Sequence, residues 1–192
     1  MPFYFVAINI IAGCWITFCI VWLAAAGLTK RAVYRESRTQ RLRYWVLLVV
    51  GYLLLMNGDR LPFPLNLRVI PKTDSIEWAG IFLCIAGVAV AFWARFTLGR
   101  NWSGNITFKE GHELIQGGPY RWTRHPIYTG LMTMLFATVI VTGRIAGLLS
   151  LALVFASFWI KLRDEEKLML EQFPDQYPAY QRRVKRIIPF VL

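Results

Sequence analysis

Charged residues are scarce in this chain of 192 residues. Only 17% of the side chains are charged and 56% are hydrophobic, whereas about 25% are charged in an ordinary soluble protein. This composition argues against a soluble globular domain and against a disordered chain. Cysteine is scarce too: the three cysteines are an odd number and lie in apolar stretches, so they indicate no disulfide framework. The class that remains is a membrane protein.

Five stretches of the chain contain no charged side chain. They cover residues 1–29, 44–58, 78–94, 126–143 and 145–160. Because a bilayer core requires roughly 20 apolar residues of helix, with a range of about 17–25, four of these stretches fit a span, the last with help from Arg144 and Lys161 at its ends. Residues 44–58 are few, and they form either a span with little tilt or a re-entrant segment. We therefore predict an all-α integral membrane protein with about five transmembrane helices, in a single domain over residues 1–192.

The first stretch also raises the question of a signal peptide. It has no basic start, and it is longer than the apolar region of about 7–15 residues that signal peptides contain. We expect a retained helix.

The basic residues indicate an orientation. Seventeen of the 22 lysines and arginines fall between residues 30 and 43, in 99–125, or from 161 onward. Five spans place these segments on one side, which the positive-inside rule makes cytoplasmic, with the N-terminus out and the C-terminus in. We expect Arg95 to snorkel from the third span to the interface. Near the C-terminus, four basic side chains are expected to contact anionic lipids: Arg182, Arg183, Lys185 and Arg186. Because the basic residues follow the topology, nucleic acid is not expected as a partner.

Two polar segments on the predicted inner side contain the candidate chemistry, namely 99–126 and 161–190. Gly143-Arg144 separates the fourth and fifth helices so closely that a tight hairpin is predicted, which brings these segments together. We accordingly divide the chain into N-terminal helices, 1–94, and a catalytic part, 95–190. The outer loop 58–75 contains three prolines and is expected to be irregular. His112 and His125 have neither a nearby cysteine nor helical i, i+4 spacing, so no metal site is predicted.

A two-part motif stands in these polar segments. Residues 118–130 read GPYRWTRHPIYTG, and the second part comprises Asp164, Glu165, Glu166, Phe173, Tyr177 and Tyr180. The pattern resembles the isoprenylcysteine carboxyl methyltransferase family, close to the phospholipid methyltransferases. In that pattern Leu168 stands one place early, with Met169 in its slot. The resemblance covers about 95–190.

The resemblance implies a cofactor, S-adenosylmethionine, bound at the cytoplasmic membrane face without a Rossmann domain. The absence of a G-x-G-x-x-G motif in the chain agrees with this. The residues implied for the cofactor site are His112, Glu113, Leu114, Ile115, Tyr120, Arg124, His125, Pro126, Ile127, Tyr128 and Glu165. Lys161 and Arg163 are implied for the substrate, and the catalytic candidates are Glu165, Glu166 and Arg163. Where the family usually has arginine, Lys161 offers a point charge in place of a fork.

The charges of the cofactor suit these side chains. Glu165 can accept from its ammonium group, and Arg124 or His125 can meet its carboxylate. The free N–H groups of a helix that starts at Pro126 favour an anionic group. A carboxylate acceptor needs no general base, whereas an amine acceptor would use Glu166 or His125.

We therefore expect methyl transfer to a lipid or lipidated acceptor, preferably a carboxylate. Phospholipid N-methylation and thiol S-methylation stay open within the same family. A sterol-type reductase that uses NADPH is an alternative, although Pro126-Ile127 departs from the asparagine that such enzymes have two places after the histidine. A non-enzymatic membrane scaffold is another. The short chain favours a prokaryotic inner membrane.

Overall fold

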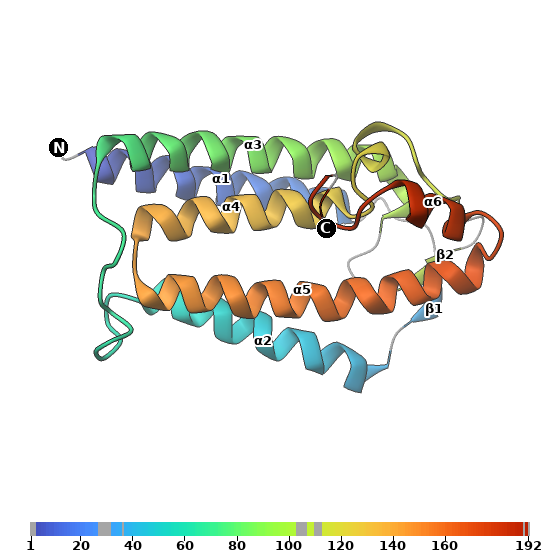
Figure 1. The fold of residues 1–192 in the computed structure, drawn as a ribbon, viewed down its shortest axis with the longest axis horizontal. Helices are drawn as coiled ribbons and strands as arrows, with labels where there is room; N and C mark the ends of the chain where they lie inside the picture. Colours follow the sequence, from blue (N-terminus) through green and yellow to red (C-terminus); the bar gives the residue numbers. More distant parts are fainter. Residues whose placement is uncertain are drawn as a thin grey trace.

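A computed structural model describes residues 3–26, 32–35, 37–102, 107–109, 113–189 and 191. Its elements are α1 (Phe3–Ala26), β1 (Ala32–Arg35), α2 (Arg38–Asn57), α3 (Asp74–Leu98), η1 (Gly99–Asn101), β2 (Thr107–Lys109), η2 (Gly118–Arg121), α4 (Pro126–Thr142), α5 (Ile145–Gln172) and α6 (Tyr177–Arg183). The long helices run side by side (Figure 1): α3 packs on α1 and α4, α2 packs on α5, and α4 contacts α5. The all-α class is confirmed. The sequence did not predict the two short antiparallel strands, which pair segments far apart in the chain.

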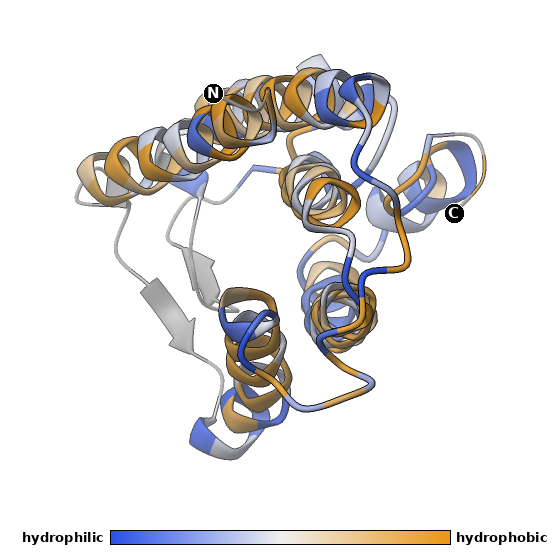
Figure 2. Cartoon of the chain, turned by 90° about the vertical axis from the view of Figure 1, so that its left-hand side faces the viewer, coloured by the Kyte–Doolittle hydropathy of each residue, from blue (hydrophilic) through white to orange (hydrophobic). Residues whose placement is uncertain are grey.

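The helices present apolar surface outward. Among the described residues, α1, α3 and α5 are long and apolar enough to cross a membrane, and α4 is a shorter apolar helix. On α1, the side chains of Phe5, Ile16 and Leu23 are exposed, and hydrophobic colour covers much of the long helices in Figure 2. Exposed apolar surface on this scale suits a bilayer. That α2 and α4 also span remains a prediction, since α2 begins with three arginines and α4 has 17 residues.

Local sequence signals set where the helices begin. Ser37 and Gln40 form a capping box at α2, with the Gln40 N–H donating to Ser37 Oγ at 3.2 Å. Thr73 caps α3 by accepting from the Ile76 N–H. Pro126 is the first residue of α4, as predicted, because its ring suits that position and no hydrogen bond is lost there.

Two glycines bring α3 and α4 into close contact. A Cβ atom added at Gly87 would lie 2.7 Å from the Gly130 carbonyl oxygen, and one added at Gly130 would lie 2.5 Å from the Gly87 oxygen. Both distances are shorter than side chains tolerate, so the crossing requires glycine on both helices. Gly130, the last residue of the first motif, therefore has a packing role.

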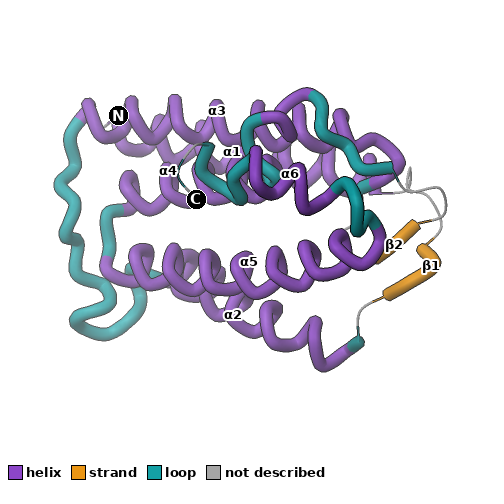
Figure 3. Tube along the Cα trace, turned by 45° about the vertical axis from the view of Figure 1, so that its right-hand side comes forward, coloured by secondary structure: helices purple, strands orange, loops and turns teal. Residues whose placement is uncertain are grey.

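The predicted hairpin between α4 and α5 is confirmed. α4 ends at Thr142, α5 begins at Ile145, and Gly143 makes the turn with a φ of 66°. The irregular loop before α3 covers this turn, because the Val69 backbone N–H donates to the Gly143 oxygen at 2.8 Å and the Arg144 guanidinium donates to the Asn66 backbone oxygen at 2.9 Å. Figure 3 shows this loop at the end of the bundle opposite the two strands.

α5 joins an apolar half to a polar half. Its 28 residues run without a break from Ile145 to Gln172, and the chain then turns at Phe173 and Pro174 into α6. The polar half of α5 lies at the same end of the bundle as α6 (Figure 1). That end brings together the two polar segments of the sequence.

Candidate active site

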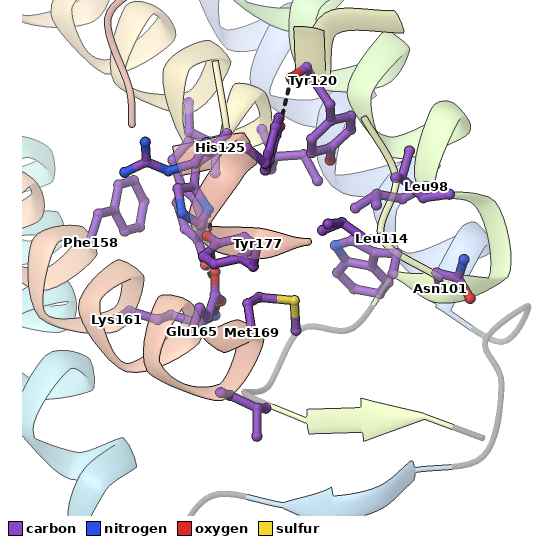
Figure 4. Close-up of a pocket in the computed structure, with 18 of the residues that line it drawn as sticks. Leu98, Asn101, Leu114, Tyr120, His125, Phe158, Lys161, Glu165, Met169 and Tyr177 are labelled. Carbon is purple, nitrogen blue, oxygen red and sulfur yellow. Dashed lines mark hydrogen bonds and ion pairs between the residues drawn. The ribbon is translucent and has the colours of Figure 1, made fainter. Parts of the chain in front are cut away.

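A cavity of about 310 Å³ lies at this polar end. α1, α3, α4, α5 and α6 contribute to its wall, together with η1, η2 and residues 113–115. One part of the wall is charged, and contains Glu113, Arg124, His125, Lys161 and Glu165. Another part is apolar, and contains Phe18, Trp22, Leu98, Trp102, Leu131 and Phe158. In Figure 4, Lys161 and Glu165 lie on one side of the cavity, with Leu98, Leu114 and Asn101 on the other.

Glu165 is the carboxylate of the charged wall. The Tyr128 hydroxyl donates to Glu165 Oε1 at 2.8 Å, and Lys161 Nζ lies 3.9 Å from the same oxygen. Its other oxygen, Oε2, lies 3.7 Å from His125 Nδ1. Lys161 also lies over the ring of Tyr128, 5.7 Å from its centre. Glu165 is thus held in place by neutral and cationic groups while it faces the cavity.

Glu166 is turned away from the cavity. Glu166 is only 3% exposed. Its carboxylate accepts from Arg124 Nε at 2.8 Å and from the Arg186 guanidinium at 2.6 Å. His125 Nε2 lies 3.2 Å from Oε1, and Gln181 Nε2 donates to Oε2 at 3.4 Å. The sequence proposed Glu166 as catalytic. The structure places it behind His125, where it supports the cavity wall without contacting the cavity.

The C-terminal segment holds the Arg-His motif by its backbone. The Arg124 N–H donates to the Lys185 oxygen at 2.8 Å, and the His125 N–H donates to the Arg186 oxygen at 3.0 Å. Thr129 Oγ1 donates to the Ile187 oxygen at 2.7 Å. Residues 124–129 of the first motif are therefore joined to residues 185–187, which lie about 60 positions later in the sequence.

Arg186 supports the site, and the sequence did not indicate this role. It was expected to contact lipid, but its guanidinium binds Glu166 and lies over the Trp159 ring, 4.6 Å from the ring centre. Arg183, expected to do the same, donates to Gln116 at 2.7 Å. Arg186 therefore finds its partners within the protein, against the expectation, whereas Arg183 is exposed and its contact with lipid stays a prediction. The sequence did not indicate these pairs, because Arg186 and Arg183 lie far along the chain from Glu166 and Gln116.

Arg95 is buried where snorkelling was expected. It is 3% exposed and donates to the Ala25 oxygen at 2.6 Å and to the Gly99 oxygen at 2.8 Å. Its guanidinium lies over the Trp102 ring, 4.4 Å from the ring centre. Arg95 therefore ties the ends of α1 and α3 together and fixes an aromatic side chain of the cavity wall.

Three tyrosines, Tyr120, Tyr177 and Tyr180, line the cavity where η2 meets α6. The Tyr180 hydroxyl donates to the Tyr120 oxygen at 2.6 Å, and Tyr177 contacts Tyr180 edge to face. Burial raises the pKa of Tyr120, Tyr177 and Tyr180 well above the usual tyrosine value. These hydroxyls therefore remain protonated donors at any working pH.

The implied site residues are brought together only in part. The cavity wall includes Glu113, Leu114, Ile115, Tyr120, Arg124, His125, Ile127, Tyr128, Lys161 and Glu165. Pro126 is buried at the start of α4 and does not line the cavity, and Arg163 is exposed and does not line it either. His112 lies outside the described residues. Within the described part of the chain, no three His, Cys, Asp or Glu side chains form a group that could hold a metal ion.

Comparison with known proteins decides the family. The model of the phospholipid methyltransferase family matches residues 76–176, which is more than half of the chain. The chain belongs to the phospholipid methyltransferase family. The match begins in α3 and ends just before α6, so the matched residues include most of the cavity wall described above.

Several proteins that are similar to this chain are named as methyltransferases. Rat protein-S-isoprenylcysteine O-methyltransferase is 29% identical over 127 residues, which are 63% of this chain and 45% of the relative. A probable rice protein-S-isoprenylcysteine O-methyltransferase is 28% identical over 175 residues, 88% of this chain and 87% of the relative. The chain spans about half the length of the mammalian relatives it matches.

A solved structure shares the fold. It is a eukaryotic intramembrane Ras methyltransferase, isoprenylcysteine carboxyl methyltransferase, and it matches with a TM-score of 0.54 and 25% identity over 83% of this chain and 55% of that one. The chain described here is likewise an integral membrane protein that crosses the membrane more than once. These relatives are eukaryotic, so they lend no support to the expected prokaryotic membrane.

Proposed function

We propose that this protein transfers a methyl group from S-adenosylmethionine to a lipophilic acceptor dissolved in the membrane, and that the acceptor group is the carboxylate of a prenylated cysteine. The observation that carries the proposal is the cavity itself, in which a charged wall and an aromatic wall meet. The names of the relatives support the acceptor chemistry. A purely structural scaffold requires no such cavity.

The charged wall fits the proposed cofactor. Glu165 and Glu113 supply carboxylates for its ammonium group, while Arg124, which lines the same wall beside His125, supplies positive charge for its carboxylate. Both signs of charge are needed because the amino-acid part of this cofactor is a zwitterion, and an unmatched charge in a half-buried cavity is costly. When bound, the cofactor supplies a methyl group activated on a sulfonium centre.

The aromatic wall fits the acceptor. Phe18 and Trp22 of α1, with Phe158 of α5, lie on helices with the length and hydropathy of membrane spans. An apolar chain in the bilayer can therefore reach the cavity without crossing water. Because that chain comes from an equally apolar bilayer, its contacts with these rings contribute through van der Waals packing.

Alignment is the main task of the protein in this reaction. A carboxylate is already a nucleophile, so no side chain has to remove a proton. Lys161 binds the acceptor carboxylate, and Tyr128 holds Glu165 so that the two reactants meet in one orientation. Positioning of this kind accounts for up to about 7–11 kcal/mol of a reaction barrier in favourable cases.

The topology follows from the same proposal. The polar end of the bundle faces the cytoplasm, where the cofactor is dissolved, and the α4–α5 turn faces the opposite side. The N-terminus is then outside and the C-terminus inside. Residues 95–190 form the catalytic part of a single domain, and 1–94 form the helices that complete its apolar wall.

Transfer of a labelled methyl group tests the function. Purified protein in lipid nanodiscs is incubated with methyl-labelled S-adenosylmethionine and an N-acetylated S-farnesylcysteine. We expect label in the farnesylcysteine, released by base as from an ester, and a loss of at least tenfold in Glu165→Gln and His125→Ala. Glu171→Gln, on the exposed end of α5, is the matched control. Label that enters phospholipid and resists base would replace the carboxylate with an amine acceptor, and the absence of label from every acceptor would overturn the proposal.

A further inference from the structure

The segment around η2 and the C-terminal segment form one surface of the molecule. Their backbones pair, since Thr123 and Lys185 form a bridge and the Arg124 N–H donates to the Lys185 oxygen at 2.8 Å. The Thr123 hydroxyl also donates to the Arg186 oxygen, at 2.7 Å. The exposed side chains of the two segments therefore belong to the same surface, although they come from distant parts of the chain.

This surface has charge of one sign. Arg121 and Lys185 are both exposed, and neither residues 114–163 nor residues 176–192 contain an aspartate or a glutamate. Glu166, which contacts both segments, is buried and bound to their inner arginines. Its negative charge is thus matched inside the protein, and the outer side of the pairing offers positive charge to a partner.

Apolar side chains are exposed among these charges. Trp122 is 40% exposed and Ile188 is 48% exposed, and the Arg121 guanidinium lies over the Trp122 ring, 4.6 Å from its centre. A partner that is anionic and fully dissolved in water would leave these apolar groups without apolar contacts. A bilayer surface suits both kinds of side chain, because it places anionic headgroups directly above an apolar acyl boundary.

The surface adjoins helices that are apolar enough to cross a membrane. The Trp122 ring meets the Trp93 ring of α3 edge to face, with centres 5.4 Å apart, and Trp93 is itself exposed. In the first turn of α4, the Thr129 hydroxyl donates to the Ile187 oxygen, and Figure 1 accordingly shows the C-terminus beside α4. Tryptophans gather where spanning helices leave the bilayer, so this surface lies at the level of the headgroups.

We propose that this surface binds the headgroups of anionic phospholipids, with Arg121 and Lys185 as the cationic contacts and Trp122 and Ile188 at the acyl boundary. The sequence indicated Lys185 for such a role but not Arg121, because only the backbone pairing brings the two segments together. None of these four residues lines the cavity. The lipid site is therefore separate from the candidate active site, and it does not depend on methyl transfer.

A fluorescence titration measures the preference for charge. The full chain in a neutral detergent is titrated with phosphatidylserine and with phosphatidylcholine, both labelled on the same acyl chain. We expect the parent to bind phosphatidylserine about tenfold more tightly or more, and the preference should shrink as salt is added. The double variant Arg121→Gln/Lys185→Gln should lose the preference. Arg60→Gln/Lys167→Gln, which removes two exposed charges elsewhere, is the matched control and should keep it.

The apolar half of the surface has its own test. Ile188→Ser should weaken the binding of both lipids, because the acyl boundary loses a contact. A soluble glutamate-rich peptide that displaces phosphatidylserine, together with parent-like lipid binding by Ile188→Ser, would assign the surface to an acidic protein partner and overturn the proposal.

Two further results decide against the lipid site. One is equal affinity of the parent for the two lipids, and the other is a preference that survives in Arg121→Gln/Lys185→Gln. If that double variant does not fold, Lys185→Gln against Lys167→Gln makes the same comparison with one exposed lysine each. Neither cofactor nor methyl acceptor is present in these titrations, so their outcome is independent of the proposed function.

Discussion

Glu165 and Glu166 are neighbours in the sequence that serve opposite sides of the cavity wall. Glu165 faces the cavity and accepts from Tyr128, whereas Glu166 is buried behind the wall and bound to Arg124, His125 and Arg186. Successive residues of an α-helix are about 100° apart, so one residue can serve the ligand while the next secures the loop that holds it.

This division predicts different defects in two matched variants. Glu165→Gln should weaken the binding of S-adenosylhomocysteine by about tenfold or more and leave the melting temperature close to that of the parent. Glu166→Gln should unfold at a lower temperature, because removal of one member of a buried ion cluster leaves its partners unpaired, at a cost of about 3–5 kcal/mol. Calorimetry and a thermal melt in detergent measure the two effects. A stable Glu166→Gln protein that has lost only ligand binding would contradict the assignment.

The contact between Gly87 and Gly130 predicts a stability defect that is independent of chemistry. Gly130→Ala should lower the stability by about 1–3 kcal/mol, the usual cost of overpacking, because the new methyl group meets the Gly87 oxygen at 2.5 Å. Gly13→Ala is the control, since a Cβ atom at that helical position has nothing within 4 Å. Denaturant titration in mixed micelles gives both values. Equal stability of the two variants would show that the helices do not meet as described.

The place of Lys161 predicts an effect on the acceptor alone. Lys161→Met should raise the KM for the farnesylcysteine acceptor by about tenfold or more, because the carboxylate loses its cation in a half-buried place. The Kd for S-adenosylhomocysteine should change little. Lys161→Arg should restore the KM, and Lys167→Met, which is exposed on the same helix, should behave as the parent does. A change in cofactor affinity without a change in KM would place Lys161 on the cofactor.

The buried tyrosines predict a loss of stability in alkali. Burial raises the pKa of Tyr180 above its unfolded value of about 10. Above that pH the unfolded chain has released a proton that the folded chain keeps, so this contribution to stability is complete below about pH 10 and falls as the pH rises further. Tyr180→Phe should therefore show a shallower fall in melting temperature between about pH 9 and 11. Tyr52→Phe, at an exposed position on α2, should follow the parent.

Much of this fold was accessible from the sequence because its signals are local. Charge-free stretches mark the helices, Pro126 marks a helix start, and Gly143-Arg144 marks the turn that joins the two polar segments. Helix geometry also predicts that Arg163 does not line the cavity. It lies two places before Glu165, which puts it about 200° around the helix, whereas Lys161 is four places before and shares its face.

Other features depend on contacts between distant parts of the chain. Arg186 pairs with Glu166 across a break in the helix, and no pattern along the sequence distinguishes it from the basic residues around it. The ladder of β1 and β2 joins segments more than 70 positions apart.

The most direct test of the account is a structure of the protein with S-adenosylhomocysteine bound. We predict the ligand inside the cavity, with its ammonium group at Glu165. Ligand density outside this cavity, or at the outer end of the bundle near the α4–α5 turn, would contradict the proposed cofactor site.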